Sequence, residues 1–169
     1  MKKLCSLWLF LGLLSWSLIF ATTCPAVEVW GVDVLQHGTY MTQVGQVEEA
    51  EDSPAERQRL VTGTEFFEET FNIPAVLGTR FGFTYVINGI PKGDIVPIRI
   101  RKLFPGLKDP RRDQVLYSHE DVREHEIGKV YGIGYGFDHD WELVPGKWTF
   151  EIFYEGNMLA EISFDVYQP

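Results

Sequence analysis

Hydrophobic and polar residues alternate along most of the chain after residue 26, a period of two that is typical of β-strands with one buried face. The alternation is strongest near the C-terminus, in residues 147–155 and 158–166. Gly156 and Asn157 lie between these segments, and both residue types are favoured in tight turns. The sequence therefore predicts a C-terminal β-hairpin.

The same pattern predicts further strands upstream. They fall in residues 27–40, 60–71, 79–87, 95–103, 113–118 and 122–137. Turn-forming residues 88–94 join the third of these segments to the fourth, so we expect those two to pair as a hairpin, with Pro97 at an edge or a bulge. Two prolines and a glycine in residues 104–112 argue against regular structure there.

Strands about ten residues apart, with no amphipathic helix longer than two turns between them, define the expected fold. We predict an all-β protein, an antiparallel immunoglobulin-like β-sandwich of about seven strands that ends in the C-terminal hairpin. Residues 27–169 form this single domain.

Glycine occupies every second position of residues 131–137. In a strand these glycines share one face, and a face without side chains indicates that another backbone or a large side chain packs closely against it. A phosphate-binding loop is excluded, because the glycine spacing and the following lysine of such loops are missing.

The first 26 residues resemble a secretory signal peptide. Lys2 and Lys3 precede a run without charge from residue 4 to 20, and small residues follow it. Cleavage is expected after Ala21 or Ala26, which gives a periplasmic or secreted domain with no membrane span. The alternatives are an uncleaved anchor and a lipoprotein attached through Cys24.

Acidic residues outnumber basic ones. The chain has 15 Lys and Arg against 24 Asp and Glu, a net charge of −9. Loss of Lys2 and Lys3 with the signal peptide makes the exported domain more acidic still. Such a domain is a poor ligand for nucleic acid, which requires clustered cations. Both cysteines precede residue 26, so cleavage after Ala26 leaves a domain without disulfides.

An acidic segment at residues 43–58 contains five carboxylates and Pro54. It is predicted to be a solvated loop. A calcium-binding loop would need acidic or amide residues at positions one, three and five with a central glycine, and that pattern is missing.

Two histidine-containing segments are weak candidates for metal binding. His119 and His125 are six residues apart, so in a continuous strand both project from one face about 20 Å apart, too far to share an ion without an intervening turn. The second candidate is the run Asp138, His139 and Asp140, for which the simpler interpretation is a turn capped by Asp138. No cofactor is predicted.

Basic residues gather in residues 99–112, and the candidates for partner binding among them are Arg99, Arg101, Arg111 and Arg112. They can meet an acidic partner or lipopolysaccharide phosphates, or they can neutralise the domain's own acidic residues. A carbohydrate-binding platform would need Trp30, Trp141 or several tyrosines to be exposed in line.

Four segments together resemble a family of secreted bacterial proteins known as a domain of unknown function. The segments are residues 73–75 with 77–83, 105–107 with 109–110, 134–138, and 141–146 with 148–152, the last completed by residues 159–161 and Phe164. The resemblance implies an extracytoplasmic immunoglobulin-like domain and brings no catalytic or binding residues.

The sequence thus predicts a non-enzymatic binding module of the bacterial cell envelope, which recognises a protein or another envelope component. There is no nucleophile elbow, and Ser118 and His119 are neighbours that a strand would point apart. The alternatives are a metal- or small-ligand-binding periplasmic module and a hydrolase of envelope polymers.

Overall fold

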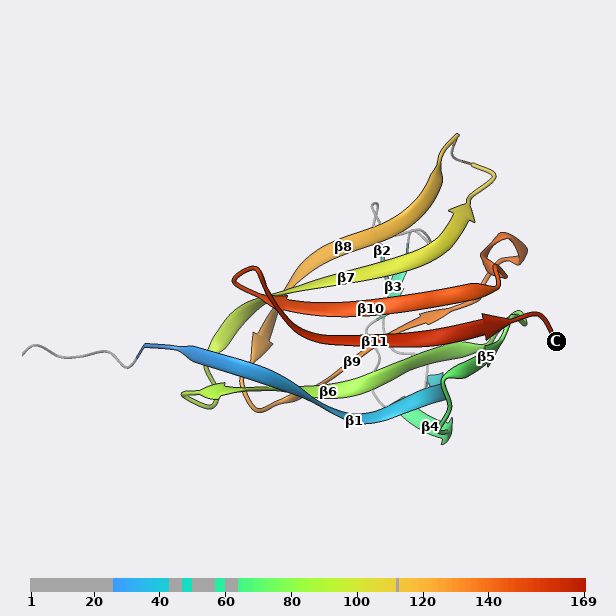
Figure 1. The fold of residues 1–169 in the computed structure, drawn as a ribbon. Helices are drawn as coiled ribbons and strands as arrows, with labels where there is room; N and C mark the ends of the chain where they lie inside the picture. The colour runs from blue at the N-terminus through green and yellow to red at the C-terminus, as the bar shows by residue number, and fades with distance from the viewer. Residues whose placement is uncertain (1–25, 43–46, 50–56, 60–63, 112) are drawn as a thin grey trace, which may run out of the picture.

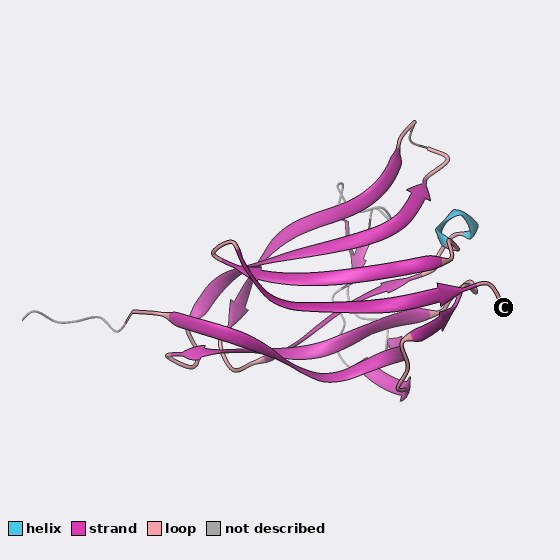
Figure 2. Ribbon diagram, viewed as in Figure 1, coloured by secondary structure: helices cyan, strands magenta, loops and turns pink. Residues whose placement is uncertain are grey.

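The protein is a sandwich of two β-sheets (Figures 1 and 2). The structure, a computed structural model, describes residues 26–42, 47–49, 57–59, 64–111 and 113–169. The four-stranded sheet has the order β4 (Thr64–Glu68), β1 (Glu28–Thr42), β6 (Arg80–Ile90), β9 (Val130–Gly136). The five-stranded sheet has the order β5 (Asn72–Pro74), β11 (Asn157–Tyr167), β10 (Gly146–Tyr154), β7 (Ile95–Lys108), β8 (Val115–Glu126).

Alternating apolar residues from both sheets fill the space between them. On β6 these are Phe81, Phe83, Tyr85 and Ile87, and opposite them lie Ile98, Ile100, Trp148, Phe150 and Ile152. Trp148 is fully buried and donates from Nε1 to the carbonyl of Val144 at 3.0 Å. This aromatic core, rather than any disulfide among the described residues, holds the sheets together.

The predicted immunoglobulin-like sandwich is confirmed, with nine strands in its two sheets instead of about seven. The C-terminal hairpin is also confirmed as β10 and β11. Its turn lies one residue earlier than predicted, because Tyr154 pairs with Asn157 and the turn residues are Glu155 and Gly156. Both have positive φ, as a two-residue hairpin turn requires.

The predicted hairpin between residues 79–87 and 95–103 is wrong. The strands exist, but β6 pairs with β1 and β9, whereas β7 pairs with β8 and β10. Each strand has an apolar face, and the two faces meet across the core, so the connecting turn crosses from one sheet to the other. Pro97 lies where β7 pairs with β8 alone, since the pairing with β10 begins at Arg99.

Residues 104–112 are more regular than predicted. β7 continues to Lys108, and its register with β8 shifts between Leu103 and Leu107. Pro105 and Gly106 lie in this irregularity, with Gly106 at φ 129°. A β-bulge therefore accommodates the residues that argued against a strand.

Part of the predicted acidic loop is a two-stranded ribbon. β2 (Val47–Glu49) pairs with β3 (Arg57–Arg59), and Glu49 is the register partner of Arg57. The loop prediction is therefore wrong for these residues, which form paired strands. The rest of residues 43–58 and the signal-peptide segment with Cys24 lie outside the described residues.

The bare glycine face of β9 is confirmed as a site of close packing. A Cβ atom at Gly134 would lie 2.5 Å from the carbonyl oxygen of Phe81 and from Oη of Tyr40. At Gly136 it would collide with the guanidinium of Arg80. Glycine is therefore needed for space at residue 134, where the backbone of Phe81 blocks a side chain.

In the described part of the chain, no helix has the length and apolar character needed to cross a membrane.

Candidate functional site

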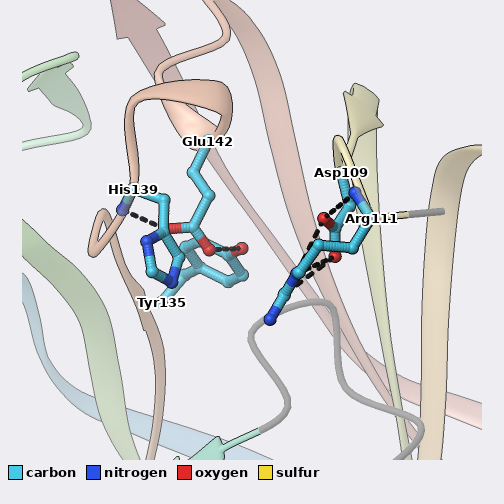
Figure 3. Close-up of polar contacts among 5 residues, drawn as sticks. All are labelled: Asp109, Arg111, Tyr135, His139 and Glu142. Atoms are coloured by element: carbon cyan, nitrogen blue, oxygen red, sulfur yellow. Dashed lines mark hydrogen bonds and ion pairs between the residues drawn. The ribbon is translucent and has the colours of Figure 1, made fainter.

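A buried carboxylate organises one end of the sandwich, next to the short helix η1 (Asp140–Glu142) (Figure 3). Glu142 is fully buried. Its Oε1 accepts a hydrogen bond from the hydroxyl of Tyr135, and its Oε2 accepts from the backbone N–H groups of Asp138 and His139, each at 2.7 Å. A carboxylate that accepts three hydrogen bonds is a structural anchor for this loop.

A second buried carboxylate, Asp109, lies at the end of β7 (Figure 3). Arg111 donates to it from its backbone N–H at 2.8 Å, from Nε at 3.0 Å and from Nη2 at 2.8 Å.

The hydroxyl of Tyr135, which binds Glu142, stays protonated. Burial and then the negative charge of Glu142 raise the pKa of Tyr135, so its hydroxyl remains a hydrogen-bond donor. Neither carboxylate is placed as a general base, since each accepts several hydrogen bonds from nearby residues of the chain.

The structure does not bring Asp138, His139 and Asp140 together around an ion. Asp138 pairs with Arg80 at 2.7 Å, and the ring of His139 stacks on Trp141 with centroids 5.7 Å apart. Asp140 is exposed. Trp141 packs against the core, so it does not join Trp30 in an exposed platform.

The inner face of β8 carries polar residues where the neighbouring strand β7 carries apolar ones. Asp121, Arg123 and His125 are register partners of Ile100, Ile98 and Val96, which face the core, and His119 is the register partner of Lys102. The two histidines therefore share a face, as predicted. They lie at opposite ends of it, and no group of three or more metal-ligating side chains occurs among the described residues.

His125 belongs to the core. The hydroxyl of Tyr85 lies 2.7 Å from its Nε2, and the ring of Tyr131 lies 4.1 Å away between centroids. Burial lowers the pKa of His125, so the ring is neutral around physiological pH. Sequence reasoning did not predict this role, although the apolar alternation on β7 indicates which face of β8 turns inward.

Lys102 is a charged residue in a core position. It follows Val96, Ile98 and Ile100 on the inward face of β7, and its Nζ donates to the carbonyl of Gly134 on β9 at 3.1 Å. Burial lowers its pKa to about 8. In the sequence, Lys102 falls among the basic residues gathered in residues 99–112. Its charge alone does not show which face of the strand the side chain occupies.

The outer face of the five-stranded sheet has a row of four residues at one level: Val122, Arg99, Phe153 and Met158. We call these the Arg99 row. The guanidinium of Arg99 lies 4.7 Å from the centre of the Phe153 ring, and that of Arg101 lies 5.0 Å from it. Val122 and Met158, at the two ends, are exposed by 64% and 54%.

The predicted partner-binding arginines have acidic neighbours within the domain. Arg99 lies 3.6 Å from Glu120, and Nε of Arg101 donates to Glu151. Arg111 binds Asp109, and Arg112 lies outside the described residues. The arginines therefore do not form one basic patch, and their pairing favours neutralisation of the domain's own acids.

A family model described as Domain of unknown function (DUF3859) matches residues 29–166. The chain belongs to this family. The DUF3859 domain thus covers both sheets of the sandwich. The chain is also similar to a solved structure, that of an immunoglobulin-like protein from Pseudomonas aeruginosa, with 27% sequence identity and a TM-score of 0.57. That match covers 84% of this chain and 97% of the other. No curated protein matches the chain.

Ser118 and His119 do not form a catalytic pair in this DUF3859 domain. Their register partners, Leu103 and Lys102, are neighbours on β7, so the two side chains leave β8 on opposite faces. The prediction that a strand would separate them is confirmed.

Proposed function

We propose that this DUF3859 protein is a non-enzymatic binding module, exported to the bacterial cell envelope, which recognises a protein partner through the Arg99 row. The single observation that carries the proposal is the composition and order of that row. Arginine, methionine and aromatic residues are enriched in protein interfaces relative to other surfaces.

The centre of the row is held in place before any partner arrives. Phe153 is almost fully buried beneath Arg99 and Arg101, and Glu151, also buried, accepts a hydrogen bond from Arg101. Side chains already ordered in the free protein lose little conformational entropy on binding. This rigid centre with exposed apolar ends supports a binding surface.

A protein partner fits this surface better than a polyanion does. The next row at the same face consists of Glu120, Arg101, Glu151 and Glu161, so acids outnumber cations beside Arg99. Lipopolysaccharide phosphates would face this excess of negative charge. A protein can bury Val122 and Met158 and still leave the charged row at a solvated rim.

Site-specific photo-crosslinking in intact cells tests the proposal. A photoreactive residue replaces Val122, and the matched control replaces Val130, a valine on β9 of the other sheet that is exposed by 55%. We expect one protein of defined mass to be captured from position 122 and not from position 130. Equal capture from both positions, or capture of lipopolysaccharide instead of protein, would contradict the proposal.

A further inference from the structure

One side of the sandwich, where β1 and β11 contact each other, has strands that are paired on one flank only (Figure 1). β1 pairs with β6 from Glu28 onward, whereas its pairing with β4 begins at Thr39. β11 pairs with β10 from Asn157, whereas its pairing with β5 begins at Asp165. Within the described residues, the stretches 28–36 and 157–164 thus have backbone N–H and C=O groups that face no neighbouring strand. We call this the β1–β11 side.

The core is less well covered along the β1–β11 side than in its centre. Val34 on β1 is the register partner of Tyr85, which is fully buried, yet Val34 is exposed by 40%. On β11, Ile162 is half-buried, although its register partner Phe150 is buried. Directly opposed residues share a face, so Val34 and Ile162 face the core. One more strand beside them would remove this apolar surface from water.

The β1–β11 side is also acidic. β1 and β11 contain no lysine or arginine, and their carboxylates are Glu28, Asp33, Glu161 and Asp165. Asp33 is exposed and is the register partner of Val86, so it lies on the outer face of its sheet. This side of the sandwich is therefore apolar toward the core and negative toward solvent. A segment that alternates apolar and basic residues complements both properties.

We propose that residues 28–36 of β1 bind an extended basic segment of another protein as an added β-strand. The backbone of the segment pairs with β1, its apolar side chains cover Val34, and its cations face Asp33. β1 is favoured over β11 because Val34 is more exposed than Ile162. The inference does not depend on the Arg99 row, which lies on the outer face of the other sheet.

Amide hydrogen exchange of the whole protein tests this site. The probe is a synthetic peptide of alternating lysine and valine, long enough to span residues 28–36, and the control peptide has glutamate in place of lysine. We expect the lysine peptide to slow exchange within residues 28–36, because newly hydrogen-bonded amides are protected, and the glutamate peptide to have no effect. No protection, equal protection by both peptides, or protection of β8 instead of β1 would overturn the proposal.

Three variants show whether the named side chains determine binding. Val34→Lys places a charge where an apolar side chain must pack, so the protection should be lost. Asp33→Lys should weaken binding of the lysine peptide at least about threefold, and it remains informative if Val34→Lys fails to fold, because Asp33 is exposed. Glu124→Lys makes the same change at an exposed acid on β8, an edge strand of the five-stranded sheet, and should retain full binding. Equal binding by Asp33→Lys and Glu124→Lys would contradict the site.

The protein without peptide distinguishes a second copy of this chain from a different partner. We expect exchange within residues 28–36 to be independent of protein concentration. Protection that increases with concentration, together with dimer formation, would show that β1 pairs with another copy and would overturn the proposal.

Discussion

The hydroxyl of Tyr85 on β6 lies 2.7 Å from Nε2 of His125 on β8, and this contact joins the two sheets. The other ring nitrogen, Nδ1, lies 3.2 Å from the carbonyl oxygen of Arg123. A carbonyl only accepts hydrogen bonds, so Nδ1 carries the proton and Nε2 accepts from Tyr85. Burial raises the pKa of Tyr85, which keeps the hydroxyl protonated as this arrangement requires.

The neutral state of His125 predicts a loss of stability in acid. Its pKa in the folded protein lies below the ordinary value of 6.5, so the unfolded chain takes up a proton first as the pH falls. We expect the free energy of unfolding to be unaffected by this group above pH 6.5 and to decrease below it. Urea denaturation across that range measures the change.

A matched pair of variants assigns this pH dependence. His125→Gln keeps an acceptor for Tyr85 and removes the titrating group, so it should flatten the dependence of stability on pH near 6.5. His139→Gln, at an exposed histidine, should leave it unchanged. An unaltered slope in His125→Gln would show that another group is responsible.

Glu142→Gln should destabilise the domain by about 2–3 kcal/mol. The substitution removes the charge that strengthens the hydrogen bonds to this group, and the amide N–H₂ of glutamine, itself a donor, would face the donors that now bind the carboxylate. Chemical denaturation gives this value. Asp140→Asn, an exposed acid in the same short helix, should change stability by less than about 0.5 kcal/mol. Similar values for both variants would mean that Glu142 does not anchor the loop.

Gly134→Ala should cost about 1–3 kcal/mol, since the added methyl group overlaps the backbone of Phe81 and the ring of Tyr40. Gly31→Ala is the control, because a Cβ atom at Gly31 meets no atom within 4 Å. Melting temperatures of the two variants provide the comparison. A Gly134→Ala protein as stable as Gly31→Ala would contradict the close packing of β9.

Export predicts a defined N-terminus. Edman sequencing or intact-mass measurement of the protein from its native bacterium should give a chain that starts at Thr22 or Val27, after cleavage at Ala21 or Ala26. An intact chain from Met1, or a lipid on Cys24, would contradict the predicted cleavage and export.

Much of the fold can be predicted from the sequence because β-strands record their buried face in every second residue. Trp148, Phe150 and Ile152 alternate without interruption, so the last hairpin and its core face were predictable. The partners of each strand were harder to predict. The strands that contain Phe83 and Ile98 show the same apolar alternation whether they pair side by side in one sheet or face each other across the core. Local turn chemistry does not distinguish these arrangements.

The polar sites were harder to predict, because their meaning depends on contacts distant in sequence. Glu142 and Tyr135 are seven residues apart and Lys102 and Gly134 thirty-two, and neither pair forms a recognisable motif. The Arg99 row joins residues from four strands, and its register depends on a bulge in the β10–β11 pairing between Ile152 and Phe153. Residue types identify candidates, and only the pairing of strands shows which of them meet.

Measurement of affinity for the crosslinked partner tests the Arg99 row most directly. Val122→Glu places a charge at the exposed apolar end of the row, and Val130→Glu makes the same change on the opposite sheet. We expect Val122→Glu to raise the Kd at least about tenfold, a loss of about 1.4 kcal/mol, and Val130→Glu to leave it unchanged. Equal affinity of the two variants, with both proteins folded, would contradict binding through the Arg99 row.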